Sequence, residues 1–498
     1  MKKYIFVVLF SALFLGLNGC KEHMDINYDP NSPAEDNLTS DMILPAAEMN
    51  IATTYSSTLH IYGAYNAQYY AQQFGTPNYI PYSQFQVSET NGNAVYTQLF
   101  QRALGNLSLV KKKAEAAGQN GILLQVATLR AFTFQLLVDA FGEVPYTEAF
   151  DPAIMAPKYD DGKVIYEGLV KEINDALAAV KADDAVATSF IIPSKSLDEW
   201  ISFANAEKLK LLTRMSNVED VTAQIQEIID GGKLPAKDIK IAGCWAPSKG
   251  QANPLFQEER STWGRVTHNI IGNVALISTL KKDGEDPRLA AWFQPNGNGV
   301  FQGSVSGDNL SNVKDAAYKS TSAWCELVLN YDDPVFFIAK TEVEFFLAEF
   351  YARKADAANA AAHYAAAIEA SFATAGVEGA ENYIAKNPYD QAKWKECIGV
   401  AKWVALGGIS GFEGYTEARR LNYPAFGTVK GEDIYKATGE LDLSLYQPGK
   451  LYTPFNVFNQ VGDNHLLERF PYPVSSTARN SNAPSFPGYL VPIFWGKE

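Results

Sequence analysis

The sequence predicts an all-α fold, in which antiparallel helix pairs carry long irregular loops on one side. Five segments repeat their apolar residues at the 3.6-residue period of an amphipathic helix. Two of them are separated only by Lys-Ala-Asp at 354–356, and small alanine faces oppose aromatic side chains across this pair. Such hairpins are typical of tetratricopeptide-like scaffolds, although a strict repeat of about 34 residues is absent. We therefore expect an irregular and interrupted helical repeat.

Four helix pairs are expected along the chain. Their approximate limits follow from the helical period and from the short connections between neighbouring segments. The expected pairs are 128–142 with 165–181, 199–216 with 219–231, 341–354 with 357–375, and 391–406 with 413–421.

Three stretches between or beyond these pairs are expected to be irregular. They are 74–92, 232–340 and 422–498, and only the segment IIGNVALISTLKK within 232–340 has a strong helical period. Because the stretches are aromatic rather than charged, they are expected to be ordered. Long ordered loops within a compact domain are usually functional, and the ligand region is expected at about 232–340.

The N-terminal residues resemble the signal sequence of a bacterial lipoprotein. Two lysines precede an apolar run over 4–17, which is too short to span a bilayer. The run leads into Leu-Asn-Gly-Cys, which looks like a lipobox, whose cysteine receives a diacylglyceryl group and becomes the new N-terminus. We expect a signal peptide over 1–19, a lipid anchor at Cys20, a polar tether over 20–40 and a single domain over 41–498. The alternative is an ordinary secretory signal that happens to contain a cysteine.

Composition and charge disfavour a nucleic-acid partner. The chain has 498 residues, of which 47% are hydrophobic and 20% charged, as is usual for a globular protein. Its 56 acidic residues outnumber 42 Lys and Arg, and the resulting net charge of −14 is opposite to what phosphate binding requires. No further apolar run of membrane length follows Cys20. Aromatic residues make up 12% of the chain, which suits a protein that stacks flat ligands.

No motif for catalysis is recognised. The histidines show no metal-ligand pairing, and neither a nucleophile elbow nor a phosphate-binding loop is present. Adjacent carboxylates, such as Glu258-Glu259 and Asp332-Asp333, are expected to be solvated loop charges, because glycosidases need two acids at a set separation in space. The sequence thus predicts a protein without enzymatic activity or cofactor. The acidic loop 283–286 could hold a Ca²⁺ ion weakly.

Three cysteines remain after the lipobox, at Cys244, Cys325 and Cys397. They are far apart in the sequence and have no metal-site spacing. We expect three small buried thiols, with one disulfide among them as the alternative.

Aromatic residues in the irregular stretches are the candidates for ligand binding. Sugar rings present apolar C–H faces that pack on aromatic planes, while Asn, Gln and Arg bond the hydroxyl groups. The candidates are Tyr79 and Tyr82 in the first stretch and Trp263, Trp292 and Trp324 in the second, where Trp245 also occurs. Trp263 is favoured, because the surrounding ERSTWGRVTHN is polar and carries two arginines. Core packing is the alternative for each of these rings.

Several motifs, in order along the mature chain, resemble those of the SusD/RagB family of outer-membrane nutrient-binding lipoproteins, particularly its SusD-like branch. Each motif alone is weak, but the ordered set is specific. The motifs are LRAFTFQLLVDAFGEVPYTEA at 129–149, WISFANAEKLKLLTRMSN at 200–217, EDPRL at 285–289, AKTEVEFFLAEFYAR at 339–353, KWVALGGISGFEGYTEARRLNYP at 402–424 and RFPYP at 469–473. Glu143 replaces the more usual Asp of the first motif.

The resemblance implies a surface lipoprotein that caps a SusC-like TonB-dependent transporter. Such proteins bind glycans or peptides without cleaving them, and their ligand lies among the loops. The resemblance also implies that Arg130, Arg419 and Arg420 are structural and pair with helix carboxylates. Three functions thus remain open: capture of a glycan or peptide, glycoside hydrolysis, and a structural adaptor that uses only the helical groove.

Overall fold

The computed structural model describes residues 37–260, 268–307, 314–435 and 438–496. The signal peptide, Cys20 and most of the tether lie outside these residues, as does Trp263.

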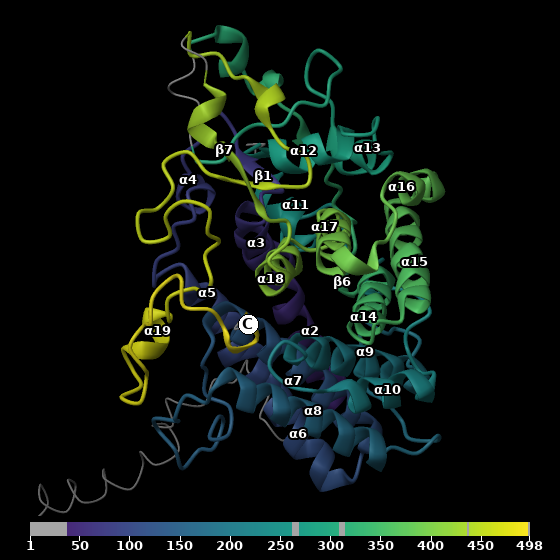
Figure 1. Cartoon of the computed structure of the whole chain (residues 1–498). Helices are drawn as coiled ribbons and strands as arrows, with labels where there is room; N and C mark the ends of the chain where they lie inside the picture. The colour runs from purple at the N-terminus through teal and green to yellow at the C-terminus, as the bar shows by residue number, and fades with distance from the viewer. Residues whose placement is uncertain (1–36, 261–267, 308–313, 436–437, 497–498) are drawn as a thin grey trace, which may run out of the picture.

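All four expected helix pairs are present, and the two helices of each pair pack together. The pairs are α7 (Asn120–Phe141) with α8 (Gly162–Ala179), α9 (Leu197–Met215) with α10 (Thr222–Gly231), α14 (Lys340–Arg353) with α15 (Ala357–Ala375), and α17 (Trp394–Leu406) with α18 (Gly411–Leu421). Figure 1 shows α7 to α10 in the lower part of the molecule, α14 and α15 at the right, and α17 and α18 near the centre. The loop-rich segments lie around the upper and left-hand parts. The expected all-α scaffold with loops on one side is confirmed.

Local sequence explains where several of these helices begin and end. Ser196 and Ser410 cap α9 and α18, because each side chain accepts a hydrogen bond from the backbone N–H three residues later. Gly232 and Gly376 end α10 and α15 in the left-handed conformation, which glycine adopts at low cost.

Helix α7 lies at the centre of the core. It is the one helix in the described part of the chain that is long and apolar enough to cross a membrane, but 94% of its apolar window is buried within the protein. It contacts α6, α8 and α9. Its apolar character on all sides is therefore that of a core helix.

Several helices were not expected from the sequence. Pro45 and a run of Ser and Thr obscure the apolar period at the start of the domain, so packing rather than local pattern defines these elements. They are α2 (Ser40–Thr53), the π-helical η2 (Thr54–Leu59), α3 (His60–Asn66), α5 (Gly92–Tyr96), the π-helical η3 (Thr97–Leu104), α6 (Gly105–Ala117) and α16 (Ala380–Lys386).

The irregular stretches contain short strands and helices. A four-stranded antiparallel sheet has the order β1 (Tyr70–Gln72), β3 (Ile270–Gly272), β5 (Glu326–Leu327) and β4 (Phe293–Gln294). Two further pairs are β2 (Ile239–Ile241) with β6 (Val335–Ile338) and β7 (Phe426–Lys430) with β8 (Leu451–Thr453). The short helices are α4 (Ile80–Ser83), α11 (Pro254–Glu259), α12 (Val274–Lys281), α13 (Arg288–Trp292) and α19 (Val474–Thr477). The helical segment expected within 232–340 corresponds to α12.

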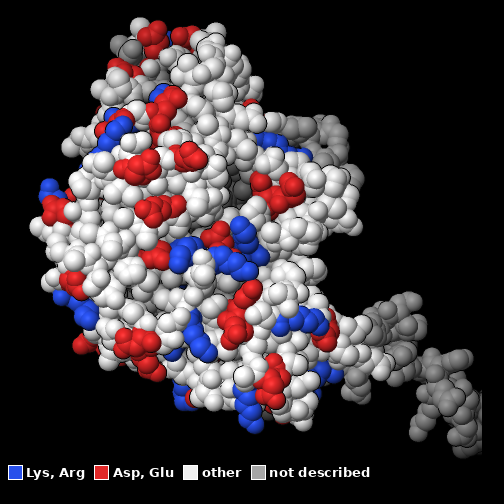
Figure 2. Space-filling model, turned by 90° about the vertical axis from the view of Figure 1, so that its right-hand side faces the viewer, with Lys and Arg blue, Asp and Glu red and all other residues white. Residues whose placement is uncertain are grey.

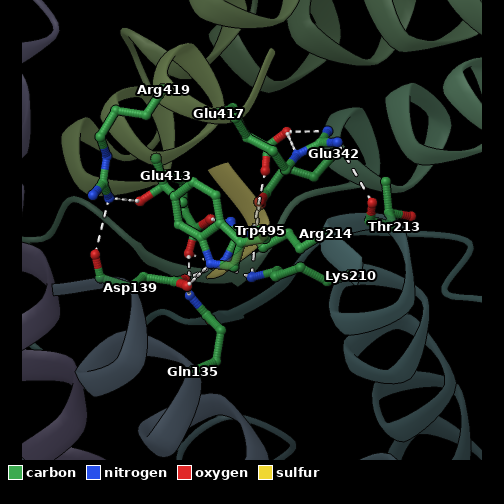
Figure 3. A network of polar contacts seen from close by, with 12 residues as sticks. Gln135, Asp139, Lys210, Thr213, Arg214, Glu342, Glu413, Glu417, Arg419 and Trp495 are labelled. Atoms are coloured by element: carbon green, nitrogen blue, oxygen red, sulfur yellow. Dashed lines mark hydrogen bonds and ion pairs between the residues drawn. The ribbon is translucent and has the colours of Figure 1, made fainter. Parts of the chain in front are cut away.

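A buried ionic network joins the helix pairs (Figure 3). Arg214 of α9 bonds the carboxylates of Asp139, Glu413 and Glu417, which come from α7 and α18. These side chains are at most 3% exposed. Removing one member of such a network would leave an unpaired charge in the core, so the network fixes the arrangement of the helices.

Two of the three arginines expected to be structural do pair with helix carboxylates. Arg130 bonds Glu172 at 3.0 Å, and Arg420 bonds Glu349. Arg419 is structural in a different way, because its guanidinium donates to the backbone carbonyls of Asp139 and Glu468.

The three cysteines are free thiols. Cys325 is buried and Cys397 is half-buried, but Cys244 is exposed, so the expectation of three buried thiols is wrong for Cys244.

Candidate functional site

Three tyrosines gather where the loop 74–79 enters α4, and we call Tyr62, Tyr79 and Tyr82 the tyrosine cluster. The ring centroids of Tyr79 and Tyr82 are 6.0 Å apart with planes inclined by 29°. Those of Tyr62 and Tyr82 are 4.5 Å apart. Pro81 in the first turn of α4 fixes the backbone between the two loop tyrosines. The structure thus brings two sequence candidates together and adds Tyr62 from α3.

Hydrogen bonds hold the cluster in place. The Tyr79 hydroxyl donates to Glu258 Oε1 at 3.1 Å, and the Tyr82 hydroxyl accepts from Asn91 Nδ2 at 2.8 Å. Tyr82 in turn donates to the Tyr62 hydroxyl at 3.3 Å. Tyr82 is half-buried and Glu258 is exposed, whereas Tyr79 is only 8% exposed. Tyr82 is therefore the ring of this cluster with the most surface for a ligand.

Two described residues flank the segment that contains Trp263. Arg260 ends α11 and donates to the carbonyl of Leu327 at 3.1 Å. His268 bonds Glu326 Oε2 at 2.5 Å through its Nδ1, and both side chains are partly exposed. Arg260 and His268 are thus both held against β5 by polar contacts.

Glu259 joins the end of α11 to the start of β3. Its carboxylate accepts the backbone N–H groups of Asn269 and Ile270 at 3.0 and 3.2 Å. Burial raises the pKa of Glu259 to about 6. Because this carboxylate is buried and bonded to the backbone, its role here is structural.

Trp292 lies elsewhere, in what we call the Trp292 pocket. This pocket has a volume of about 230 Å³, and its walls come from η2, β1, α11, α13, β6 and the connection between α17 and α18. The Trp292 side chain is half-buried and lies against Gly408, where an added Cβ would approach the indole Nε1 to 2.2 Å. Trp292 therefore forms a fixed wall of a separate space.

Trp324 is a core residue. Its side chain is 1% exposed and packs against Tyr318, with ring centroids 5.7 Å apart. A buried ring has no free face for a sugar, so the expectation of a ligand contact at Trp324 is not supported by its position. Trp245 is half-buried and packs against the main core.

No metal site is evident in the described parts of the chain. No cluster of three or more His, Cys, Asp or Glu there has an arrangement that could hold a metal ion. In the acidic loop 283–286, Asp286 bonds Arg288 at 2.7 Å. Figure 2 shows acidic and basic side chains interspersed over a largely uncharged face.

Sequence reasoning missed the partners of the cluster. Tyr62 belongs to a helix that the apolar period does not reveal, and Glu258 was interpreted as a solvated charge. His268 and Glu326 are 58 residues apart in the sequence, and only the pairing of β3 with β5 brings them together.

The fold resembles that of several solved proteins. A SusD homologue from Bacteroides uniformis shares 19% identity, with a TM-score of 0.71 and coverage of 92% of this chain and 100% of the other. A chitin-binding SusD homologue from Flavobacterium johnsoniae shares 18%, with a TM-score of 0.70 and coverage of 91% and 97%. A SusD homologue from Bacteroides fragilis shares 17%, with a TM-score of 0.69 and coverage of 93% and 100%.

Sequence comparison assigns the family. A search of curated proteins finds no significant match. The SusD-like family profile, described as starch-binding and associating with the outer membrane, matches residues 30–438. This match covers most of the chain and agrees with the fold. The protein therefore belongs to the SusD-like family of outer-membrane-associated proteins.

Proposed function

We propose that this protein is a cell-surface lipoprotein that captures an oligosaccharide or polysaccharide at the tyrosine cluster. It then delivers the glycan to a SusC-like TonB-dependent transporter in the outer membrane. The half-exposed ring of Tyr82, held by hydrogen bonds among polar side chains, is the observation that carries the proposal. A sugar ring needs this combination of an aromatic face and neighbouring hydrogen-bonding groups.

The arrangement of the carboxylates near the tyrosine cluster fits binding of a glycan rather than its cleavage. Glycoside hydrolysis needs two carboxyl groups that face one glycosidic bond. Glu258 is exposed and accepts from Tyr79, while Glu259 is buried and accepts two backbone N–H groups. The two carboxylates lie in different environments, and each accepts hydrogen bonds from other groups of the protein. They therefore do not form such a pair.

The start of the described chain suits a lipid-anchored protein. Asp41 accepts from the backbone N–H and the hydroxyl of Thr188 at 2.6 and 2.7 Å. Glu48 accepts from the Ser189 hydroxyl and from the Phe190 N–H, both at 2.6 Å. A tether that leads from Cys20 into α2 would therefore pull on a helix that is firmly bonded to the rest of the domain.

The proposal is tested by native affinity electrophoresis of the mature protein in gels that contain single polysaccharides, with an assay for released sugar. We expect starch, chitin derivatives or another glycan to retard the protein without release of sugar. Tyr82→Ala should lose the retardation. The matched control is Tyr351→Ala, which removes a half-buried tyrosine of α14 that stacks on His363. Equal mobility in every gel would overturn glycan capture, and released sugar would overturn the non-enzymatic function.

A further inference from the structure

The Trp292 pocket lies across a row of packed rings from the tyrosine cluster. Ring contacts run from Tyr79 to Tyr65 at 5.7 Å, from Tyr65 to Tyr70 at 6.3 Å, and from Tyr70 to His60 at 5.6 Å. Tyr70 and His60 line the pocket at the far end of this row. The rings fill the space between the two places, so the pocket is a second, separate cavity.

The pocket has an open rim and a buried end. Asn330 and Gly408 at the rim are exposed. At the other end, Tyr55, His60 and Tyr70 are 2%, 8% and 5% exposed. The volume of about 230 Å³ equals that of about eight water molecules in the liquid. A single small ring with its substituents fits such a space, whereas a folded segment or a long chain does not.

The hydrogen bonds of His60 leave the Tyr70 hydroxyl with a spare proton. Nδ1 of His60 accepts the backbone N–H of Gly411 at 3.2 Å, so this nitrogen carries no proton. Burial lowers the pKa of His60 to about 4, and the ring is neutral at pH 7. Its proton is therefore on Nε2, which donates to the Tyr70 oxygen at 2.8 Å. The Tyr70 O–H remains to donate to an acceptor, and no other hydrogen bond of this hydroxyl is seen among the described residues.

A second tyrosine at the buried end is also incompletely bonded. The hydroxyl of Tyr55 is buried and makes no hydrogen bond of good geometry among the described residues, although the Ser410 side chain lies beside it. A buried hydroxyl without a partner is unfavourable, so a ligand oxygen that accepts its proton would remove this penalty. Tyr55 and Tyr70 both line the pocket, and the hydroxyl of each keeps a proton that a ligand oxygen could accept.

The groups around the pocket select a neutral polyhydroxyl ligand. Among the described residues, no lysine or arginine lines the pocket and Asp333 is its one charged wall residue, so an anion finds no counter-charge on these residues. An apolar ligand would leave both tyrosine hydroxyls unpaired. A sugar ring supplies oxygens that accept from them and hydroxyls that donate to Asp333 or Asn330 at the rim.

We propose that the Trp292 pocket binds one pyranose sugar, either free or as the end residue of a glycan. The choice of sugar over other polyols rests on the proposed function, whereas the site differs from the tyrosine cluster. The pocket would then recognise a single chain end or a released monosaccharide, while the cluster binds along a glycan.

Saturation-transfer difference NMR on the mature protein tests the pocket. The probes are glucose, galactose, mannose and N-acetylglucosamine, each added alone. We expect transfer to at least one of them, with affinity about three- to tenfold weaker in Tyr55→Phe and in Tyr70→Phe, since each variant removes one donor. Tyr55→Phe should not lower the thermal stability of the protein, because the deleted hydroxyl makes no hydrogen bond of good geometry and its burial is unfavourable. Absence of transfer to all four sugars would mean that the pocket holds solvent only and would overturn the proposal.

Tyr446→Phe is the matched control. The Tyr446 hydroxyl is also buried without a hydrogen-bond partner, but Tyr446 does not line the pocket. This variant should bind the sugar as the parent does. Equal weakening in Tyr446→Phe and Tyr55→Phe would contradict the placement of the sugar, as would full affinity in both pocket variants.

The two proposals can fail separately. Tyr82→Ala should lose retardation by polysaccharide and still show saturation transfer to the monosaccharide. If Tyr82→Ala instead abolishes saturation transfer to the monosaccharide, the sugar binds at the tyrosine cluster, and the proposed site in the Trp292 pocket is wrong. If no polysaccharide retards the protein but a monosaccharide binds in a Tyr55-dependent way, the result supports the Trp292 pocket as a sugar site. The same result contradicts glycan capture at the tyrosine cluster.

Discussion

Arg420 and Glu349 form a fully buried ion pair between α18 and α14, in which Nη1 of the arginine bonds Oε1 of the glutamate at 2.7 Å. The second guanidinium nitrogen bonds the other carboxylate oxygen at 2.5 Å. This paired geometry is the strongest form of a charge-assisted hydrogen bond. Since α14 and α18 belong to different helix pairs, the contact fixes one pair against the next.

Removing one member of this pair should strongly destabilise the fold. Arg420→Met leaves Glu349 and Glu417 with fewer partners in the core, and we expect the free energy of unfolding to fall by about 3–5 kcal/mol. Urea denaturation followed by circular dichroism measures this loss. The control is Lys171→Met, which breaks an exposed pair with Asp175 and should cost less than about 1 kcal/mol. Similar losses in the two variants would contradict a structural role for the buried pair.

Glu48 should give stability a distinctive pH dependence. Burial raises its pKa from 4.5 to about 7. The folded protein therefore holds this proton between pH 4.5 and 7 while the unfolded chain does not, and the stabilising contribution is present below pH 4.5 and lost as pH rises through 7. Relative to Glu48→Gln, the parent protein should lose up to about 3 kcal/mol over this interval. The difference in unfolding free energy between the two proteins, measured in urea from pH 4.5 to 8, tests this.

Glu349 provides a contrast of opposite sign. Its pKa is lowered from 4.5 to about 2, with the charges of Arg420 and Arg353 outweighing the effect of burial. Its contribution should be constant above pH 4.5 and fall only as pH drops towards 2. The difference in unfolding free energy between the parent protein and Glu48→Gln could instead change only as pH drops towards 2, as for Glu349, or not change with pH at all. Either result would contradict the raised pKa of Glu48.

The helix pairs could be predicted from the sequence because each carries its apolar period within a short stretch of chain. The limits of α14 and α15 differ from the expected ones by one residue at most. The first helices of the domain could not be predicted in this way, since Pro45 interrupts the pattern of α2 and packing against α6 and η3 defines it instead.

The candidate site was predictable only in part. Tyr79 and Tyr82 are close in sequence and meet in the structure, but Trp292 lies in another cavity and Trp324 in the core. Trp324 was a candidate because it lies in the irregular stretch 232–340, whereas its ring turns inward and packs on Tyr318. The Trp292 pocket combines residues from seven stretches that are distant in the sequence. The spare proton of Tyr70 depends on the tautomer of His60, which no sequence pattern reveals.

Gly408 should be required for the position of Trp292. A Cβ at this residue would lie 2.2 Å from the indole Nε1, so Gly408→Ala must displace the ring. We expect a loss of about 1–3 kcal/mol in stability and a shift in tryptophan fluorescence. The control is Gly231→Ala in α10, where an added Cβ would have no neighbour within 4 Å. This control should be neutral or slightly stabilising, because alanine favours the helix. Unchanged fluorescence in Gly408→Ala would contradict the contact.

Cys20 should be the site of membrane attachment, which follows from the lipobox-like pattern of the sequence. We expect Cys20→Ala to lose incorporation of an alkyne-labelled palmitate and to leave the membrane fraction, because no acyl chain then holds the mature protein at the bilayer. Cys244→Ala is the matched control, since Cys244 is an exposed free thiol in the folded domain and its loss should leave label and fractionation unchanged. An ordinary secretory signal predicts the contrary result, in which neither variant changes the label or the fraction. If the palmitate label persists in Cys20→Ala but disappears in Cys244→Ala, the lipid is attached within the folded domain. This result would contradict a tether that begins at Cys20.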